Sequence, residues 1–213
     1  MTRPPRHAAF TLIEMITVIA IIAILAGLIL ATNGLVQKKS ALARADAEIR
    51  QLSSAIESYK TDNGGYPQDA NTTDLLDPRN ISDAIDISQT GKPARASLYL
   101  YECLSGDTDG NGTIDSTETG KNYAPDFFRP SRLGGTKDPN TGKVSPVKYI
   151  MDPFGNPYGY STAGLAIEQQ YRAALATNPN AQRQAQQGYN PTFDLWSCAG
   201  DTSGQSAKWI KNW

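Results

Sequence analysis

The sequence predicts an α+β protein in which one long N-terminal helix packs on a small antiparallel β-sheet. A continuous apolar stretch begins at residue 10, apolar residues with the period of a helix follow from residue 35 to about residue 62, and no proline interrupts them. Two short segments later in the chain alternate side chains as a strand does. A third feature is a loop at residues 107–118, whose oxygen-bearing side chains have the spacing of a calcium-binding loop.

The first part of the helix is an apolar segment at residues 10–34, which follows nine mostly polar residues. Between Phe10 and Ala31 its only charged residue is Glu14. A carboxylate within a membrane helix costs about 2.5–3.5 kcal/mol on insertion scales, so Glu14 is a functional-site hypothesis whose partner has to be found. We therefore expect residues 10–34 to be a transmembrane and assembly helix. The alternative is a plain membrane anchor with Glu14 at the membrane interface.

A short leader precedes this helix. Ala8 and Ala9 stand before the apolar segment and no similar pair of small residues follows it, so a cut here would leave the helix on the mature chain. The motif Phe-Thr-Leu-Ile-Glu that begins at Phe10 resembles the leader junction of type IV pilins and type II secretion pseudopilins, which usually carry Gly where this chain has Ala9. The resemblance implies that a prepilin peptidase removes residues 1–9 and methylates Phe10.

The same resemblance implies a role in filament assembly for Phe10, Thr11 and Glu14. Glu14 would pair with the N-terminal amine of Phe10 in a neighbouring subunit, where both charges are out of water. Arg3 and Arg6 lie before the span and few basic residues follow it closely, which places the leader in the cytoplasm and the body outside it. The chain would then be a single-pass protein of the inner membrane with a periplasmic C-terminal domain.

Residues 35–62 continue the helix as an amphipathic extension. One apolar face is formed by residues at intervals of three, four and seven: Leu35, Leu42, Ala45, Ile49, Leu52, Ile56 and Tyr59. The Asn-Gly-Gly sequence that starts at Asn63 permits a left-handed cap and Pro67 cannot continue a helix, so the helix should end near Asp62. Residues 63–213 are expected to form one globular domain.

Three segments resemble the major pseudopilin family of type II secretion, protein G. The end of the helix matches this family at Tyr59, Lys60, Asn63, Gly64, Tyr66 and Pro67. The DPFGNPYGY segment (152–160) and the FDLWS segment (193–197) match motifs of its short sheet, with Phe154 in place of a Trp. The resemblance implies a pilin-like fold with strands in these two segments. Residues 165–187 between them indicate an Ala- and Gln-rich helical insertion with a break at Asn178.

The loop DTDGNGTIDSTE (107–118) follows a short apolar segment, 97–105, that we interpret as a helix. Candidate ligands occupy positions 1, 3, 5, 7, 9 and 12 of a calcium loop: Asp107, Asp109, Asn111, Thr113, Asp115 and Glu118. Gly112 stands at position 6, where the chain must turn sharply. Calcium takes six to eight oxygens at about 2.3–2.6 Å, so each required residue type is present. A bound ion would stabilise the fold, and the alternative is an acidic loop without metal.

Composition argues against catalysis and against nucleic-acid binding. The only histidine, His7, lies in the leader, and the chain has no GxSxG, P-loop or HExxH motif. The hydrophobic fraction of 39% includes the N-terminal helix, so the rest of the chain is polar. The formal charge of −1 becomes more negative without Arg3 and Arg6, which gives no electrostatic reason to bind nucleic acid. We expect a structural protein and no enzyme.

Two further features leave alternatives open. Cys103 and Cys198 are the only cysteines, and both would lie outside the cytoplasm, where disulfides persist. They allow either one bridge or two buried thiols. Relatives in the protein G family carry a calcium site near the C-terminus, and Ser197, Gly200 and Asp201 approximate that segment with altered spacing. A second calcium site at Asp201 is therefore an open question.

The function implied by the resemblance is structural. The chain would be a subunit of a type II secretion pseudopilus, a homo-oligomeric filament that supports protein export. Its implied partners are the prepilin peptidase, the inner-membrane components of the secretion assembly, the minor pseudopilins and the membrane. One alternative is a type IV pilin of a surface fibre for adhesion or DNA uptake. Another is a membrane-anchored, calcium-dependent binding module.

Overall fold

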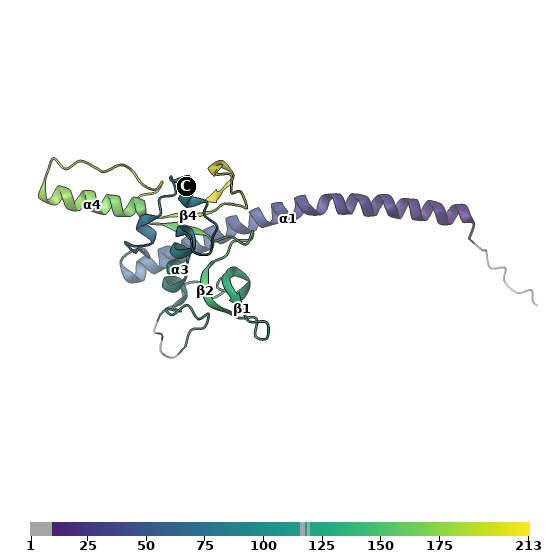
Figure 1. The fold of residues 1–213 in the computed structure, drawn as a ribbon, viewed down its shortest axis with the longest axis horizontal. Helices are drawn as coiled ribbons and strands as arrows, with labels where there is room; N and C mark the ends of the chain where they lie inside the picture. Colours follow the sequence, from purple (N-terminus) through teal and green to yellow (C-terminus); the bar gives the residue numbers. More distant parts are fainter. Residues whose placement is uncertain (1–9, 116–117, 119) are drawn as a thin grey trace, which may run out of the picture. The chain divides into compact units, whose positions relative to one another are not determined.

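A computed structural model of the chain describes residues 10–115, 118 and 120–213, apart from the side chains of residues 29–33. The predicted leader, which includes Ala9, lies outside the described residues. The chain forms two compact units, residues 1–40 and residues 41–213. The larger unit contains all the strands that the described residues form (Figure 1).

Helix α1, Leu12–Asn63, is continuous and contributes residues to both units. It ends where the sequence predicts. Gly64 has a φ of 77°, and its N–H donates a hydrogen bond to the carbonyl of Lys60 at 2.8 Å. Glycine adopts this left-handed conformation without the steric cost of a Cβ atom, so the Asn-Gly-Gly sequence explains the cap.

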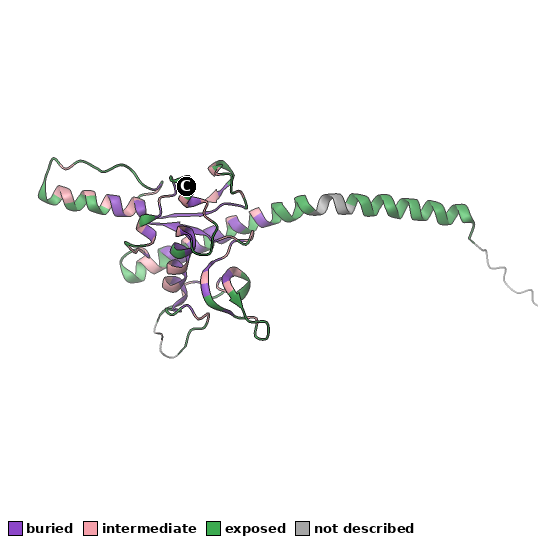
Figure 2. Cartoon of the chain, in the orientation of Figure 1, coloured by how far each residue is buried: buried purple, intermediate pink, exposed green. Residues whose placement is uncertain are grey.

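Within the larger unit, α1 buries one face (Figure 2). The buried residues of this face are Ala41, Ala45, Glu48, Ile49, Leu52, Ala55 and Ile56. The predicted apolar face is confirmed from Ala45 to Ile56. Leu35, which we expected on the same face, is 68% exposed because it belongs to the smaller unit. The covered part of the helix therefore begins near Ala41.

Short helices and strands follow α1 along the chain (Figure 1). The helical elements are η1 (Thr73–Leu75), α2 (Ile81–Ala84), α3 (Lys92–Ser105), η2 (Pro130–Arg132), α4 (Ala163–Thr177) and η3 (Ser206–Lys208). The strands are β1 (Leu133–Lys137), β2 (Val144–Ile150), β3 (Gly159–Ser161), β4 (Asp194–Ser197) and β5 (Ile210–Lys211). Helix α3 confirms the helix predicted at 97–105. Helix α4 stops directly before the predicted break at Asn178, and the rest of the insertion is not helical.

The strands form two small antiparallel sheets, whereas the sequence predicted one. Strands β3, β4 and β5 pair in that order, and β1 pairs with β2 as a hairpin. Strands β3 and β4 confirm the strands expected in the segments 152–160 and 193–197. The β1–β2 hairpin was not predicted, because exposed and buried residues do not alternate regularly along β2.

The main core lies where α1 and α3 meet the strands. Leu52 and Ile56 of α1 and Leu100 and Leu104 of α3 are fully buried in it. Helix α3 packs against β2 and β3, and the N–H of Ile150 in β2 donates a hydrogen bond to the Ser97 hydroxyl at 2.9 Å. These contacts hold the C-terminal end of α3 in place, and the acidic loop starts there.

A buried ionic contact also joins α1 to the strands. Glu48 is 7% exposed, accepts a hydrogen bond from the Tyr158 hydroxyl at 2.8 Å and lies 3.3 Å from Nε of Arg132. A buried carboxylate is costly unless it is paired and hydrogen-bonded, so this pairing stabilises one rotation of α1 about its axis. Glu48 is not among the residues of the predicted apolar face, and its burial depends on partners from distant segments.

A buried carboxylate in β4 makes the stability of the larger unit depend on pH. Asp194 accepts hydrogen bonds from the N–H groups of Tyr189 at 2.8 Å and Asn190 at 2.9 Å. Burial, reinforced by the nearby Asp77, raises the pKa of Asp194 from 3.8 to about 6. Between these values the folded chain binds a proton that the unfolded chain lacks, so the free energy of unfolding rises as the pH falls.

We therefore expect the wild-type chain to become more stable relative to an Asp194→Asn variant between about pH 7 and about pH 4, since asparagine does not titrate. A pKa shift of two units corresponds to about 3 kcal/mol, which is the upper limit of the effect. Denaturant unfolding of both chains at the two pH values, with calcium chelated, measures the difference. Identical pH dependence of the two chains would contradict the role of this carboxylate.

Candidate functional site

The start of α1 carries a capping box built from two of the predicted assembly residues. Thr11 stands directly before the helix, and its hydroxyl accepts a hydrogen bond from the N–H of Glu14 at 3.3 Å. Oε2 of Glu14 accepts hydrogen bonds in return from the N–H and the hydroxyl of Thr11, each at 2.8 Å. The two residues therefore satisfy groups that a helix N-terminus leaves without partners.

This pairing gives the Glu14 carboxylate a partner within its own chain. The sequence analysis assigned Thr11 and Glu14 to assembly separately and looked for the partner in a neighbouring subunit. The Thr-x-x-Glu spacing is a local signal for a capping box and would have revealed the contact. The third assembly residue, Phe10, is 75% exposed and takes no part in the box. Ala9, the other processing residue, lies outside the described residues.

The first turns of α1 are exposed along their length (Figure 2), and their large apolar side chains are highly exposed. Every large apolar side chain between Phe10 and Leu28 is between 45% and 78% exposed. Large contiguous apolar patches are rare on soluble monomers, and they mark surfaces for association. In the part of the chain that the structure describes, no helix combines the length and the hydropathy needed to span a membrane.

The acidic loop begins directly after α3. Gly106 ends the helix with a φ of 83°, and its backbone lies so close to Gly120 that a Cβ atom on Gly106 would come within 2.7 Å of the Gly120 carbonyl oxygen. These two glycines bring the ends of the loop together. Gly112 at the predicted sharp turn has a φ of 82°, so the turn is confirmed at the position where the motif requires glycine. The loop also contacts β2, since the N–H of Val147 donates to the Gly110 carbonyl at 2.8 Å.

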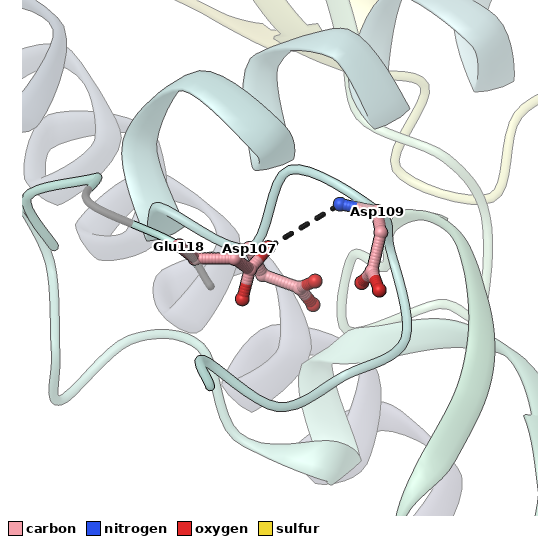
Figure 3. A group of neighbouring side chains, drawn as sticks. All are labelled: Asp107, Asp109 and Glu118. Carbon is pink, nitrogen blue, oxygen red and sulfur yellow. Dashed lines mark hydrogen bonds between the residues drawn. The ribbon is translucent and has the colours of Figure 1, made fainter. Parts of the chain in front are cut away.

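Three of the predicted ligands come together within the loop (Figure 3). Carboxylate oxygens of Asp107, Asp109 and Glu118 lie within 4.8 Å of one another. Asp107 is fully buried, and it accepts hydrogen bonds from the Tyr101 hydroxyl at 2.6 Å and from the N–H of Gly112 at 2.7 Å. The first and last positions of the motif, far apart in sequence, are thus brought to the same place.

The other three predicted ligands hold the loop in shape. Asn111 donates its side-chain amide to Asp109 at 2.8 Å, and its side-chain oxygen accepts the N–H of Thr113 at 2.8 Å. The N–H of Asp115 donates to Oε2 of Glu118 at 3.1 Å. The Asp115 carboxylate does not belong to the group of three carboxylates. The structure thus groups the carboxylates at the first, third and last positions of the motif, and the six calcium ligands stay a prediction.

The carboxylates of the loop have different proton affinities. Burial raises the pKa of Asp107, whereas the N–H of Asn111 lowers the pKa of Asp109. The N–H groups of Asp115 and Thr108 lower the pKa of Glu118. At neutral pH the loop therefore concentrates negative charge around a buried carboxylate. Hard cations such as calcium prefer oxygen donors of this kind.

The two cysteines do not form the bridge that the sequence allowed. Both are free in the structure, and they lie in different surroundings. Cys198 packs in the cluster around Trp196 and Trp209, 3.5 Å from the Ala84 carbonyl oxygen. Cys103 of α3 interacts instead with the hydroxyl groups of Tyr59 and Tyr99. Their separation follows from the orientation of α3, which directs Cys103 toward α1.

The structure gives no support to a calcium site at Asp201. Oδ1 of this residue accepts the N–H of Ser203 at 2.9 Å, and Oδ2 lies 3.4 Å from Nζ of Lys208. Among the described residues, Asp201 belongs to no group of three metal-binding side chains. A lysine next to a carboxylate competes with a metal ion for it, so Lys208 disfavours a cation here.

The comparisons with known proteins concern the N-terminal segment. Residues 4–30 match the family described as the prokaryotic N-terminal methylation motif. Neither a curated protein nor a solved structure matches the chain. The α+β fold, with a long N-terminal helix and small antiparallel sheets, is consistent with a pilin-like fold. The methylation motif at the start of this helix supports the conclusion that the chain is a type IV pilin-like protein.

Proposed function

We propose that the protein is a structural subunit of a type II secretion pseudopilus and has no catalytic role. The observation that carries the proposal is the N-terminal one: a methylation motif whose Thr11–Glu14 capping box opens a helix with an exposed apolar surface. Subunits held in the inner membrane by residues 10–34, with the body in the periplasm, would pack through this surface into a homo-oligomeric filament. The apolar segment leaves lipid for the filament core in that step.

Two segments favour a pseudopilus over a surface pilus. The end of α1 with its Gly64 cap and the turn at 152–160 both resemble protein G, and Tyr158 and Tyr160 of the second segment are buried in the main core. The implied partners are the prepilin peptidase, the inner-membrane secretion components and the minor pseudopilins. A surface fibre would use the same processing and the same assembly helix, so deletion of the gene separates the two functions: loss of protein export supports the pseudopilus.

The first test of the proposal is the mass of the protein isolated from native membranes. We expect residues 1–9 to be absent and Phe10 to carry one N-terminal methyl group, because the Phe-Thr-Leu-Ile-Glu sequence that begins at Phe10 resembles a prepilin leader junction. Intact-mass and peptide mass spectrometry measure both changes. An Ala9→Lys variant is the control, since a large charged residue before the cut should block processing. Retention of Met1 in assembled filaments would refute the proposal.

We further propose that the loop 107–118 binds calcium and stabilises the larger unit. Asp107, Asp109 and Glu118 would supply carboxylate oxygens, with Asn111 and the carbonyl of Thr113 as further donors and Asp115 at a position that often acts through water. The donor set fits calcium because it consists only of oxygen atoms and carries several negative charges. The loop follows α3 directly and is hydrogen-bonded to β2, so an ion in the loop would hold these two elements together.

A further inference from the structure

A cavity of about 340 Å³ lies beside the acidic loop, and none of the proposed calcium ligands lines it. Its walls come from the last turn of α1, the last turn of α3, Gly106 and Thr108 at the start of the acidic loop, and the segment 120–123. The side chains that give it its chemistry are Tyr59, Asn63, Glu102, Cys103, Lys121 and Tyr123. All of these residues lie in the larger unit.

The C-terminal end of α3 contributes negative potential to the cavity, whereas Lys60 offsets the end of α1. A helix C-terminus carries a partial negative charge, and basic residues in the last turn usually offset it. Helix α3 has no basic residue in its last turn and has Glu102 there instead. The buried Asp107 follows a few residues later and adds its own charge. Glu102 is thus placed where its charge is unfavourable for the helix.

The Glu102 carboxylate also lacks the donors that such a group needs. It is half-buried, and no residue within 10–115, 118 or 120–213 donates a hydrogen bond to it. Carboxylates removed from water are normally paired with a cation or hydrogen-bonded. A residue that breaks this rule without compensation in its own chain points to a ligand that supplies the missing partner.

Aromatic rings line the same cavity. Tyr59 and Tyr123 meet edge to face, with ring centroids 5.4 Å apart. Nζ of Lys121 lies 5.0 Å from the centroid of Tyr123, so this ring already faces an ammonium group at the rim. Nζ of Lys121 lies 2.5 Å from Oδ2 of Asp62, so Lys121 forms its ion pair with Asp62 and not with Glu102. Aromatic faces combined with a carboxylate favour organic cations over metal ions.

We propose that this cavity binds an organic cation, an ammonium or guanidinium group of the size of a lysine or arginine side chain. The carboxylate of Glu102 pairs with the charge, the rings of Tyr59 and Tyr123 contact its alkyl or planar part, and the C-terminal end of α3 adds a favourable potential. The inference does not depend on the proposed filament or on calcium.

The test uses the full-length chain in detergent, saturated with calcium, and N-propylguanidinium and n-butylammonium as probes. Ligand-observed NMR should detect binding of at least one probe, and Glu102→Gln should weaken it about tenfold or more, since the charge partner is lost. The same substitution should raise the melting temperature without ligand, because it removes an uncompensated charge from the end of α3. A residue with a purely structural role would show the opposite change in melting temperature.

Asp126→Asn is the matched control, because it removes the same charge from an exposed side chain outside the cavity. It should leave probe binding unchanged. A blocked tripeptide with a central arginine distinguishes the two sources of the cation: binding of the tripeptide identifies a basic protein side chain, and binding of the small probes alone identifies a free amine or guanidine. No binding of any probe, or equal binding by the Glu102→Gln variant, would overturn the proposal.

Discussion

A Glu14→Ala variant is expected to be processed and inserted normally but to yield almost no filaments. The substitution removes two things: the acceptor of the Thr11 capping box, and the carboxylate that we propose to pair with the methylated amine of Phe10 in a neighbouring subunit. Loss of a helix cap costs about 1 kcal/mol, which α1 tolerates because it continues for many turns. Loss of a charge partner out of water is more severe, since it leaves the amine unpaired.

Two further variants separate the cap from the charge. Thr11→Ala removes the hydroxyl of the box and keeps the carboxylate, so filaments should still form. Glu14→Gln keeps an oxygen that can accept the hydrogen bonds of Thr11 but carries no charge, so filaments should fail as they do for alanine. Filament yield from sheared cells, with intact mass as the measure of processing, compares the variants. Normal assembly of Glu14→Gln would disprove the charge pairing.

Calcium is expected to raise the melting temperature of the full-length chain by several degrees. Binding to the folded state alone adds about 2.7 kcal/mol when calcium stands a hundredfold above its dissociation constant. For a body of this size that corresponds to a shift of about 5–10 °C. The physical reason is the group of three carboxylates within 4.8 Å, which repel one another until a cation joins them. Melting curves in calcium and in chelator measure the shift.

Glu118→Ala should abolish this difference, because Glu118 supplies the closing ligand of the loop. Asp201→Ala should keep it, since Asp201 is already paired with Lys208 in a different part of the larger unit. The two variants remove the same charge, so a general electrostatic effect of calcium would change both alike. Coincident melting curves of the wild-type chain in calcium and in chelator would disprove the site.

Features that depend on neighbouring residues could be predicted from the sequence. The end of α1 follows from glycine at residue 64, and the end of α4 follows from the Asn-Pro pair that starts at Asn178. The turn of the acidic loop follows from Gly112 for the same reason: the conformation belongs to the residue itself. The Thr11–Glu14 box was equally local, and it was missed only because the carboxylate was assigned to a neighbouring subunit.

Features that depend on distant residues could not be predicted. A polar residue such as Glu48 is expected on the exposed face of an amphipathic helix, but here it is buried against Arg132 and Tyr158. Buried and exposed residues do not alternate regularly in the β1–β2 hairpin, because α3 and the acidic loop cover only parts of its surface. The cavity at Glu102 exists because the ends of α1 and α3 meet there.

The sequence by itself determined the long helix α1, its C-terminal end, the N-terminal methylation motif and the acidic residues of the loop. Each of these follows from local backbone preference or from a fixed spacing along one segment. Only the tertiary structure decided that α1 is covered from Ala41 onward, that Cys103 and Cys198 stay apart, and that Asp107, Asp109 and Glu118 form one group of carboxylates. Burial and pairing between distant residues result from the packing of the whole chain, so the pattern within one segment does not predict them.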